Sequence, residues 1–371
     1  MIADDWKDGN RRGAREQENS QIHCPVRNAL EDTIAEYQGA SFPNPILQAK
    51  GHNQKDMKLT AAFTLFLLLA TPLAASDPQI TYLALGDSVS FGMNVTLVPP
   101  YSYAAPTPSE FTGFPTILSY LVPPFSPNNL ANASCPGETS GSFLNVTSPD
   151  NGCNSDHNVY PPPGSGLPTI CLPPFKTALE KPPAGCSGPS PGLHVPYTES
   201  QMAYAMTQLG KDSHVNLVTL MIGANDVLLV LPQIEEQCGT NAACAQALLM
   251  PVLANYANNL GIILTMLRNV YSGKLVLVTY YSPTPALNTV AQQLNSTMTM
   301  VAAHFTNIII ADSYTPFQIA SAPFGGDPCK AGLLIKLPAN AYNTSACDIH
   351  PSPVGRDLIA AAVDFALLFQ H

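Results

Sequence analysis

The sequence predicts an α/β protein, a three-layer α/β/α sandwich around a mostly parallel sheet of about five strands. Short apolar runs alternate with longer stretches of helical pattern through most of residues 78–371, and parallel strands need such crossovers. The runs are continuously apolar, as expected of strands that helices cover on both faces. Proline is abundant, at 36 of 371 residues, which disfavours a helical bundle.

Four apolar runs are the clear strand candidates. In chain order they are Gln79–Leu85, His214–Ile222, Lys274–Tyr280 and Asn307–Ala311, with a weaker candidate near Asn128–Ala133. Helices are expected at about 111–121, 199–209, 243–270, 286–304 and 353–369. Residues 149–196, rich in proline, glycine and cysteine, predict an irregular insertion that disulfides staple, either a pocket wall or decoration.

The N-terminal region differs from the rest of the chain in charge and hydropathy. Residues 1–56 hold 16 of the chain's 42 charged groups, and a lysine, an apolar run and small residues follow in 57–75. This order is typical of a secretory signal peptide, and the run is shorter than the roughly 20 residues of a membrane span. The alternative is a cytoplasmic tail with a type II anchor.

We therefore expect Met57 to be the true start and 57–75 to be a signal peptide that is cleaved near Ser76. Residues 1–56 are then a hydrophilic extension that need not be translated. Residues 76–371 form one domain, secreted or periplasmic, without a stable membrane anchor after cleavage.

Cysteine use agrees with export, because disulfides persist in oxidising compartments. Eight of the nine cysteines lie in residues 76–371. Neighbour pairing predicts Cys238–Cys244 and Cys329–Cys347, which leaves two further bridges among Cys135, Cys153, Cys171 and Cys186. No C-x-x-C or H-E-x-x-H pattern occurs, so neither a metal nor a cofactor is expected.

The charge balance restricts the partners. The formal net charge is −10, and a phosphate backbone needs clustered lysine and arginine. Nucleic acid is therefore excluded as a partner, and we expect a monomer that acts on a small-molecule, lipid or sugar substrate.

Polar clusters follow two predicted strands and precede the last helix. Gly86-Asp87-Ser88 and Gly223-Ala224-Asn225-Asp226 stand at strand ends, and Asp348-Ile349-His350-Pro351 comes before residue 353. Ligands of open parallel sheets bind beyond these carboxyl ends. Serine, asparagine and histidine supply a nucleophile, an oxyanion donor and a general base. Proline after His350 favours an extended residue, so we expect this histidine on a loop.

These clusters resemble the blocks of the GDSL family of esterases and lipases, the SGNH hydrolases. The blocks correspond to Gly86-Asp87-Ser88, Cys135-Pro136-Gly137-Glu138-Thr139, Gly223-Ala224-Asn225-Asp226 and Asp348-Ile349-His350-Pro351, in the family's order. The resemblance implies the flavodoxin-like SGNH hydrolase fold and a secreted enzyme that hydrolyses carboxylic esters. A carbohydrate O-acetyl esterase or a catalytically silent binding protein on the same fold are the alternatives.

The resemblance also implies roles for single residues. Ser88 is the nucleophile and His350 its base, while Ser88, Gly137 and Asn225 form the oxyanion hole. The family's acid lies three residues before the histidine, whereas Asp348 lies two before it. Either Asp348 or the backbone carbonyl of Cys347 therefore orients His350, and we expect Asp348.

A second serine motif is rejected. Gly188-Pro189-Ser190-Pro191-Gly192 fits G-x-S-x-G, but that elbow needs a strand before it and a helix after it. Proline-rich sequence flanks Ser190 on both sides, and Pro191 has no N–H to donate.

Overall fold

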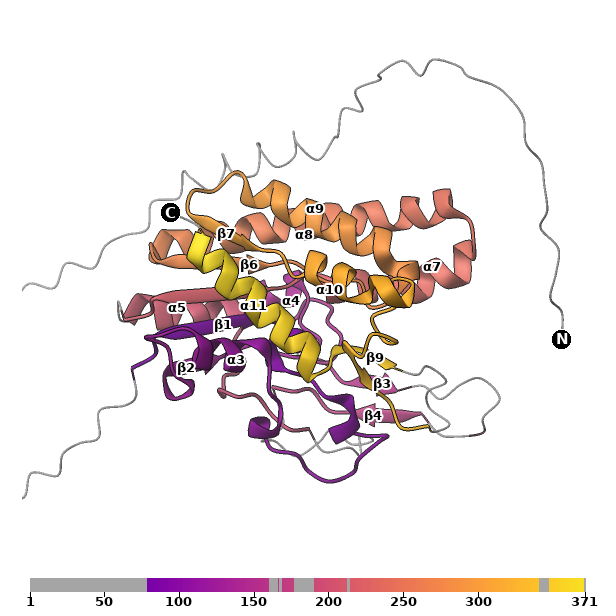
Figure 1. Ribbon diagram of the computed structural model, residues 1–371, viewed down its shortest axis with the longest axis horizontal. Coiled ribbons are helices and arrows are strands. Elements are labelled where there is room, and N and C mark those ends of the chain that lie inside the picture. Colours follow the sequence, from indigo (N-terminus) through magenta and orange to yellow (C-terminus); the bar gives the residue numbers. More distant parts are fainter. Residues whose placement is uncertain are drawn as a thin grey trace, which may run out of the picture. The chain divides into compact units, whose positions relative to one another are not determined.

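A five-stranded, wholly parallel sheet forms the centre of the protein (Figure 1). The computed structural model describes residues 79–159, 166, 169–176, 190–211, 214–339 and 347–369. The sheet has the order β2-β1-β5-β6-β7. Its strands are β1 (Tyr82–Gly86), β2 (Leu130–Asn132), β5 (Leu217–Met221), β6 (Lys274–Val278) and β7 (Ile308–Ala311).

The register explains the continuous apolar runs. Tyr82 of β1 pairs with Leu217 of β5, and Leu217 pairs with Lys274 of β6. Every residue of β1 and β5 is buried, because helices cover the two faces of a doubly wound sheet. All five predicted strands are therefore confirmed, including the weak candidate near residue 130.

Helices lie on both sides of the sheet, which gives three layers (Figure 1). In one layer α3 packs against α11, and in the other α5 and α9 both pack on α8. The helices are α2 (Ser88–Phe91), α3 (Phe114–Leu121), α4 (Ser140–Leu144), α5 (Gln201–Lys211), α6 (Ala224–Leu228), α7 (Leu231–Cys238), α8 (Ala242–Val270), α9 (Asn288–Ala302), α10 (Tyr314–Ser321) and α11 (Pro353–Phe369). The five predicted helices correspond to α3, α5, α8, α9 and α11, and the sandwich architecture is confirmed.

Two small antiparallel sheets lie outside the central one. They pair β3 (His157–Val159) with β4 (Ile170–Leu172), and β8 (Leu334–Lys336) with β9 (Cys347–Pro351). The expectation that His350 lies on a loop is wrong, because His350 belongs to β9. The proline after it favours extended backbone, and β8 supplies the pairing partner that makes this segment a strand.

Helix α8 is the one helix of the described residues that is long and apolar enough to span a membrane. Of its apolar stretch, 44% is buried inside the protein. It packs against α4, α5, α6, α7 and α9. Neighbouring helices thus bury part of its apolar surface.

Three disulfides join described residues. Cys238–Cys244 and Cys329–Cys347 form as predicted, and Cys135 pairs with Cys153. Cys171 is also disulfide-bonded. Cys186, which belongs to the predicted insertion 149–196, lies outside the described residues. Residues 1–78 lie outside them as well.

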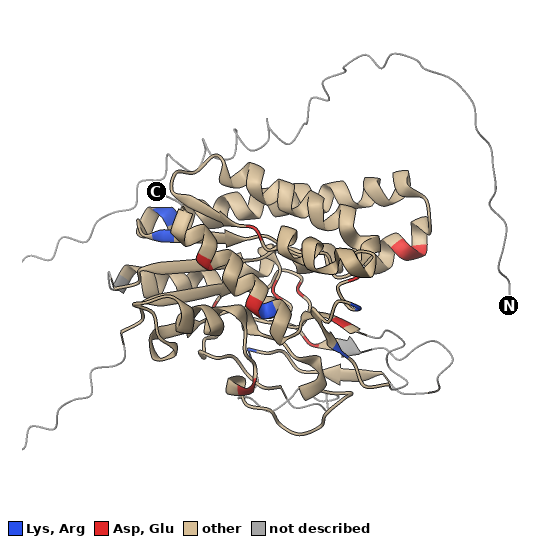
Figure 2. Ribbon diagram, in the orientation of Figure 1, with Lys and Arg blue, Asp and Glu red and all other residues tan. Residues whose placement is uncertain are grey.

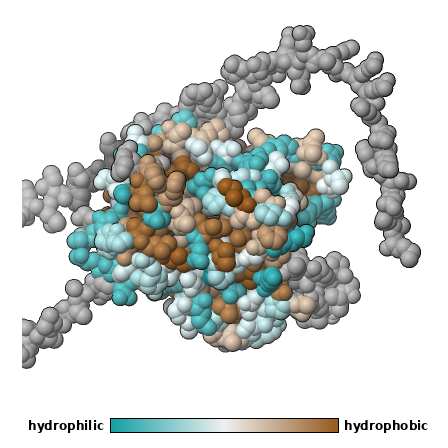
Figure 3. All heavy atoms as spheres, viewed as in Figure 1, coloured by the Kyte–Doolittle hydropathy of each residue, from teal (hydrophilic) through white to brown (hydrophobic). Residues whose placement is uncertain are grey.

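Few residues of the helices are charged (Figure 2). Apolar side chains gather over α10 and α11 in the view of Figure 3. The large exposed ones on these helices, or just after α10, are Ile319, Phe324, Val354, Phe365, Leu368 and Phe369. This face contributes to the low charge content of 11%.

Candidate active site

The proposed nucleophile lies on a tight turn between β1 and α2. Gly86 ends β1 with φ +132°, and a Cβ there would lie 2.1 Å from the carbonyl oxygen of Met221. Only glycine fits this close backbone approach. Asp87 then caps α2, accepting a hydrogen bond from the N–H of Val89 at 3.0 Å. Ser88 is consequently the first residue of a helix at the carboxyl end of the sheet.

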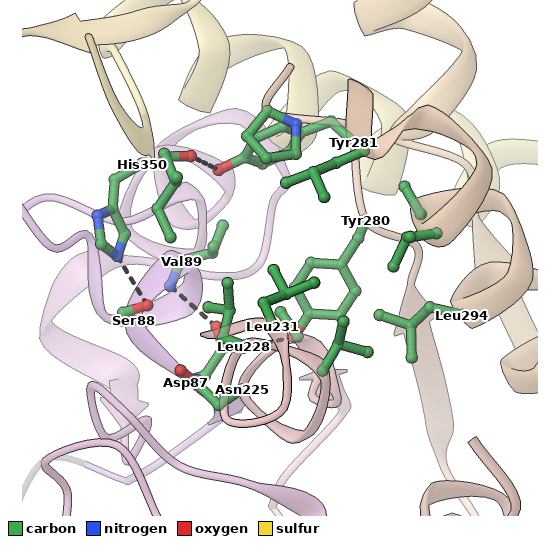
Figure 4. A pocket seen from close by; sticks show the side chains of 17 residues that line it. Asp87, Ser88, Val89, Asn225, Leu228, Leu231, Tyr280, Tyr281, Leu294 and His350 are labelled. Carbon is green, nitrogen blue, oxygen red and sulfur yellow. Dashed lines mark hydrogen bonds between the residues drawn. The ribbon is translucent and has the colours of Figure 1, made fainter. Parts of the chain in front are cut away.

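The histidine is held from two sides. Strand β9 pairs with β8, and the disulfide Cys329–Cys347 fixes the start of β9. The hydroxyl of Tyr281 donates to the carbonyl oxygen of Ile349 at 2.7 Å, which Figure 4 shows as a dashed line. The backbone on both sides of His350 is therefore fixed.

Ser88, His350 and Asp348 come together in one chain of hydrogen bonds. Nε2 of His350 lies 2.8 Å from Oγ of Ser88 (Figure 4). Nδ1 of His350 makes a short hydrogen bond to Oδ2 of Asp348, which also accepts from the backbone N–H of His350 at 3.3 Å. A spacing of two residues is thus enough for the acid to reach the histidine, because the Asp348 carboxylate turns toward both the ring and the backbone N–H of His350.

The acid changes the proton affinity of the histidine. Burial by itself lowers the pKa of His350, but the charge and hydrogen bond of Asp348 outweigh it, and the net shift is upward. Burial likewise favours the neutral form of Asp348, and the imidazole overcomes this effect and lowers the pKa of that carboxyl. Each group therefore stabilises the charged form of the other.

Asn225, the second residue of α6, and Gly137, on the segment between β2 and α4, lie at the same sheet edge. Asn225 is 3% exposed, and its Nδ2 donates one hydrogen bond to the carbonyl oxygen of Glu138 at 3.0 Å. Gly137 has φ +83°, and a Cβ there would collide with the backbone of Asn151. In the described part of the chain, the N–H groups of Ser88 and Gly137 donate to no backbone acceptor. These two N–H groups and the second hydrogen of Nδ2 can therefore donate to a bound oxyanion.

A second buried acid lies directly behind the nucleophile. Asp87 is fully buried, and burial raises its pKa to about 6 although the hydroxyl of Tyr280 donates a short hydrogen bond to it. Asp87 also contributes to the upward shift in the pKa of His350. We assign it to the support of the turn, since its two carboxylate oxygens are taken by Val89 and Tyr280.

An apolar pocket of about 80 Å³ opens beside the serine and histidine (Figure 4). Helices α6, α7 and α9, together with the chain that follows β6, supply its walls. The apolar lining consists of Val89, Ala224, Val227, Leu228, Leu231, Pro283, Leu287, Val290, Ala291, Leu294 and Ile349. Figure 4 places Ser88 and Leu294 at opposite sides of it.

Some contributors to the site are absent from the sequence motifs. Tyr280 and Tyr281 lie two and three residues beyond the end of β6 and line the pocket. The rule that ligands bind beyond strand carboxyl ends applies equally to β6 and could have indicated these tyrosines. Gln201, which touches Gly86, has no such signal.

One cluster of potential metal ligands occurs among the described residues. It contains Cys135, Glu138 and Cys153. The two cysteines are joined in a disulfide, so they supply no thiolates. The donor set that remains is a single carboxylate, which does not make a metal site.

No family model and no curated protein matches the chain. Solved structures similar to it include a lipolytic protein of the G-D-S-L family from Veillonella parvula (13% identity, covering 78% of this chain and 98% of that one, TM-score 0.38). Others are the acetylxylan esterase Axe2 from Geobacillus stearothermophilus (14%, 79% and 97%, TM-score 0.40) and the lipase Lip_vut3 from a goat rumen metagenome (14%, 78% and 97%, TM-score 0.42).

Proposed function

We propose that this chain is a serine hydrolase of the GDSL type that cleaves carboxylic esters with an apolar acyl group. One observation carries the proposal. Oγ of Ser88, 2.8 Å from Nε2 of His350, lies at one side of a pocket lined mainly by apolar side chains. A hydroxyl with a base that has its own acceptor is the arrangement of an activated nucleophile.

In the first half of the reaction Ser88 becomes acylated. His350 takes the proton of Oγ on Nε2 as Oγ attacks the carbonyl carbon, and the carbonyl electron pair moves onto the oxygen. The N–H groups of Ser88 and Gly137 and the amide of Asn225 donate to this oxyanion. The bond to the alcohol oxygen then breaks, and His350 gives its proton to the leaving alkoxide.

In the second half water replaces the alcohol. His350 removes a proton from the water, whose oxygen attacks the acyl carbon. The bond to Oγ breaks, the proton returns to Ser88, and the carboxylic acid leaves. Throughout, Asp348 holds the imidazole by Nδ1 and stabilises its positive form.

The volume of the pocket favours an apolar acyl chain of medium length. A water-sized group needs roughly 10–15 Å³, so a volume of about 80 Å³ takes about five to eight such groups. Burial of each methylene in such a lining contributes about 0.8 kcal/mol. An acetyl group leaves most of this pocket empty, which disfavours the O-acetyl esterase alternative.

We further propose that the chain works outside the reducing cytoplasm. The three disulfides of the described residues support an oxidising compartment, as does the predicted signal peptide at 57–75. Secretion itself is tested at the N-terminus of the exported protein, as set out below.

The test is hydrolysis of p-nitrophenyl esters from acetate to laurate, beside acetylated sugars. We expect kcat/KM to rise from acetate to a medium chain and then to fall. Faster hydrolysis of acetylated sugars than of any graded ester would favour the O-acetyl esterase. No turnover of any ester, with Ser88 unreactive to a phosphonate, would indicate a silent binding protein.

A further inference from the structure

We propose that Gln201, acting with Glu138 and Lys176, is the positioning residue of the site. It holds the loop that carries Gly137, here called the oxyanion loop, in place relative to the turn that carries Ser88. Gln201, Glu138 and Lys176 are called the Gln201 cluster. The inference rests on the proposed ester hydrolysis and adds residues that touch no substrate but set the geometry of the groups that do.

Gln201 hydrogen-bonds to the backbone of Gly86, the last residue of the strand that precedes the nucleophile. It is the first residue of α5 and is fully buried. Its Oε1 accepts from the N–H of Gly86 at 2.5 Å, and its Nε2 donates to the carbonyl oxygen of Gly86 at 3.0 Å. The amide satisfies both backbone groups of Gly86, as a neighbouring strand would. Ser88 stands only two residues further along.

The same amide reaches the oxyanion loop. Nε2 of Gln201 also donates to Oε2 of Glu138 at 3.1 Å, so both of its hydrogens are used. Glu138 directly follows Gly137, and its carbonyl oxygen accepts from Nδ2 of Asn225. One side chain therefore links the turn of Ser88, the loop of Gly137 and, through Glu138, the amide of Asn225. These are the three proposed oxyanion donors.

Lys176 balances the charge in the Gln201 cluster. Glu138 is fully buried, and Nζ of Lys176 lies 3.9 Å from its Oε2, with only 4% of the lysine side chain exposed. The hydroxyl of Ser142 donates to Oε1 at 2.7 Å. An unpaired carboxylate beside Gly137 would oppose the negative charge that develops on the oxyanion, since charges interact strongly where water is excluded. The lysine removes this opposition.

Gln201→Met tests the positioning role, because methionine keeps the length and removes all three hydrogen bonds. We expect kcat on the best p-nitrophenyl ester, and the rate at which a p-nitrophenyl phosphonate labels Ser88, to fall by about 10- to 100-fold, with KM changed by less than about threefold. Gln293→Met is the matched control. Gln293 bonds Gln246 on another helix, does not line the pocket, and its replacement should leave kcat unchanged.

A double-mutant cycle separates positioning from general loss of structure. In an Asn225→Ala background the oxyanion hole already lacks one donor, so Gln201→Met should cost less than about threefold in kcat. Fully multiplicative losses, or a Gln201→Met enzyme as fast as wild type, would overturn the inference.

The charge argument has its own test, which also decides the matter if Gln201→Met does not fold. Lys176→Met should lower kcat by about tenfold, and adding Glu138→Gln should restore most of it, because the pair is then neutral. Absence of any loss in Lys176→Met, or loss without restoration, would contradict the role. A wild-type chain that neither hydrolyses esters nor is labelled at Ser88 would instead refute the proposed function itself.

Discussion

The proposed reaction depends on the protonation state of the His350 imidazole. Its Nε2 must be unprotonated to accept the proton of Ser88. Asp348 at Nδ1 fixes the tautomer that leaves Nε2 free. The same contact raises the pKa of the ring above its ordinary value of 6.5, so the acid that orients the base also narrows the pH range in which it works.

The pH dependence of hydrolysis follows from that shift. Activity requires the neutral ring, and an upward shift in its pKa extends the protonated, inactive form to higher pH. We therefore expect the acid limb of kcat/KM to reach half its plateau above pH 6.5. A pH–rate profile on one p-nitrophenyl ester measures it, and a midpoint below 6.5 would contradict the assignment.

Asp348→Asn should change both the rate and this profile. The amide can hold the wrong tautomer, which lowers kcat by about 10² to 10⁴. Without the carboxylate, the effect of burial, which lowers the pKa of His350, is no longer offset by Asp348. The acid limb should therefore move to lower pH. A loss below about tenfold with an unmoved limb would show that a backbone carbonyl orients the ring instead.

Ser88→Ala removes the nucleophile and leaves the pocket in place. We expect kcat to fall by roughly 10⁴ to 10⁶ while the circular dichroism spectrum is unchanged, since Ser88 is half-buried and its side-chain partner is His350. A serine-directed phosphonate should label Ser88 in the wild type. Labelling at Ser190 would reverse the choice of nucleophile.

At the scale of elements, the β8–β9 hairpin carries the base and acid, while the parallel sheet carries the nucleophile. The hairpin is short, and the disulfide Cys329–Cys347 closes an 18-residue separation at the start of β9. Asp348 and His350 lie one and three residues beyond that cysteine. Their position therefore depends on a small element that the disulfide ties down.

Removal of this disulfide should cost stability and activity together. The Cys329→Ala/Cys347→Ala variant should lose about 3 kcal/mol of unfolding free energy in chemical denaturation, and kcat should fall more than about tenfold. The control is Cys238→Ala/Cys244→Ala, which opens a six-residue separation away from His350 and should cost about 2 kcal/mol with kcat nearly unchanged. Equal kcat in the two variants would show that the hairpin needs no staple.

Helix α9 sets the depth of the pocket through Leu294, which is 3% exposed. Leu294→Ala extends the pocket on the side opposite Ser88 (Figure 4). We expect the ratio of kcat/KM for decanoate over butyrate to rise by about tenfold. Leu253→Ala on α8, equally buried at 5% but outside the pocket, has a similar cost of about 2–5 kcal/mol in stability and should leave the ratio unchanged.

At the scale of the whole molecule, the sheet order places the proposed nucleophile and oxyanion donors at the same carboxyl end of the sheet. β1, β2 and β5 are neighbours, and all are parallel, so the segments after them meet at their carboxyl ends. Ser88 follows β1, Gly137 follows β2 and Asn225 follows β5. The topology alone thus brings together residues that are 137 positions apart in the chain.

The proposed signal peptide predicts where the mature protein begins. Protein collected from the medium of a secreting host should begin near Ser76 and lack tryptophan fluorescence, because the single tryptophan is Trp6. N-terminal sequencing and intact mass measure this. Peptides from residues 1–56 on the exported protein would refute the cleavage.

The sequence by itself determined the sheet and the residue types of the site. Continuous apolar runs indicate strands covered on both faces, and a serine, a glycine, an asparagine and a histidine in order resemble the blocks of the GDSL family on which the proposed ester hydrolysis rests. Only the tertiary structure decided that Asp348 reaches the ring of His350, that apolar side chains of α6, α7 and α9 form a pocket, and that Gln201 joins Gly86 to Glu138. Gln201 lies 115 residues from Gly86, and no local pattern records such a bond, because side-chain hydrogen bonds depend on which loops the fold packs together.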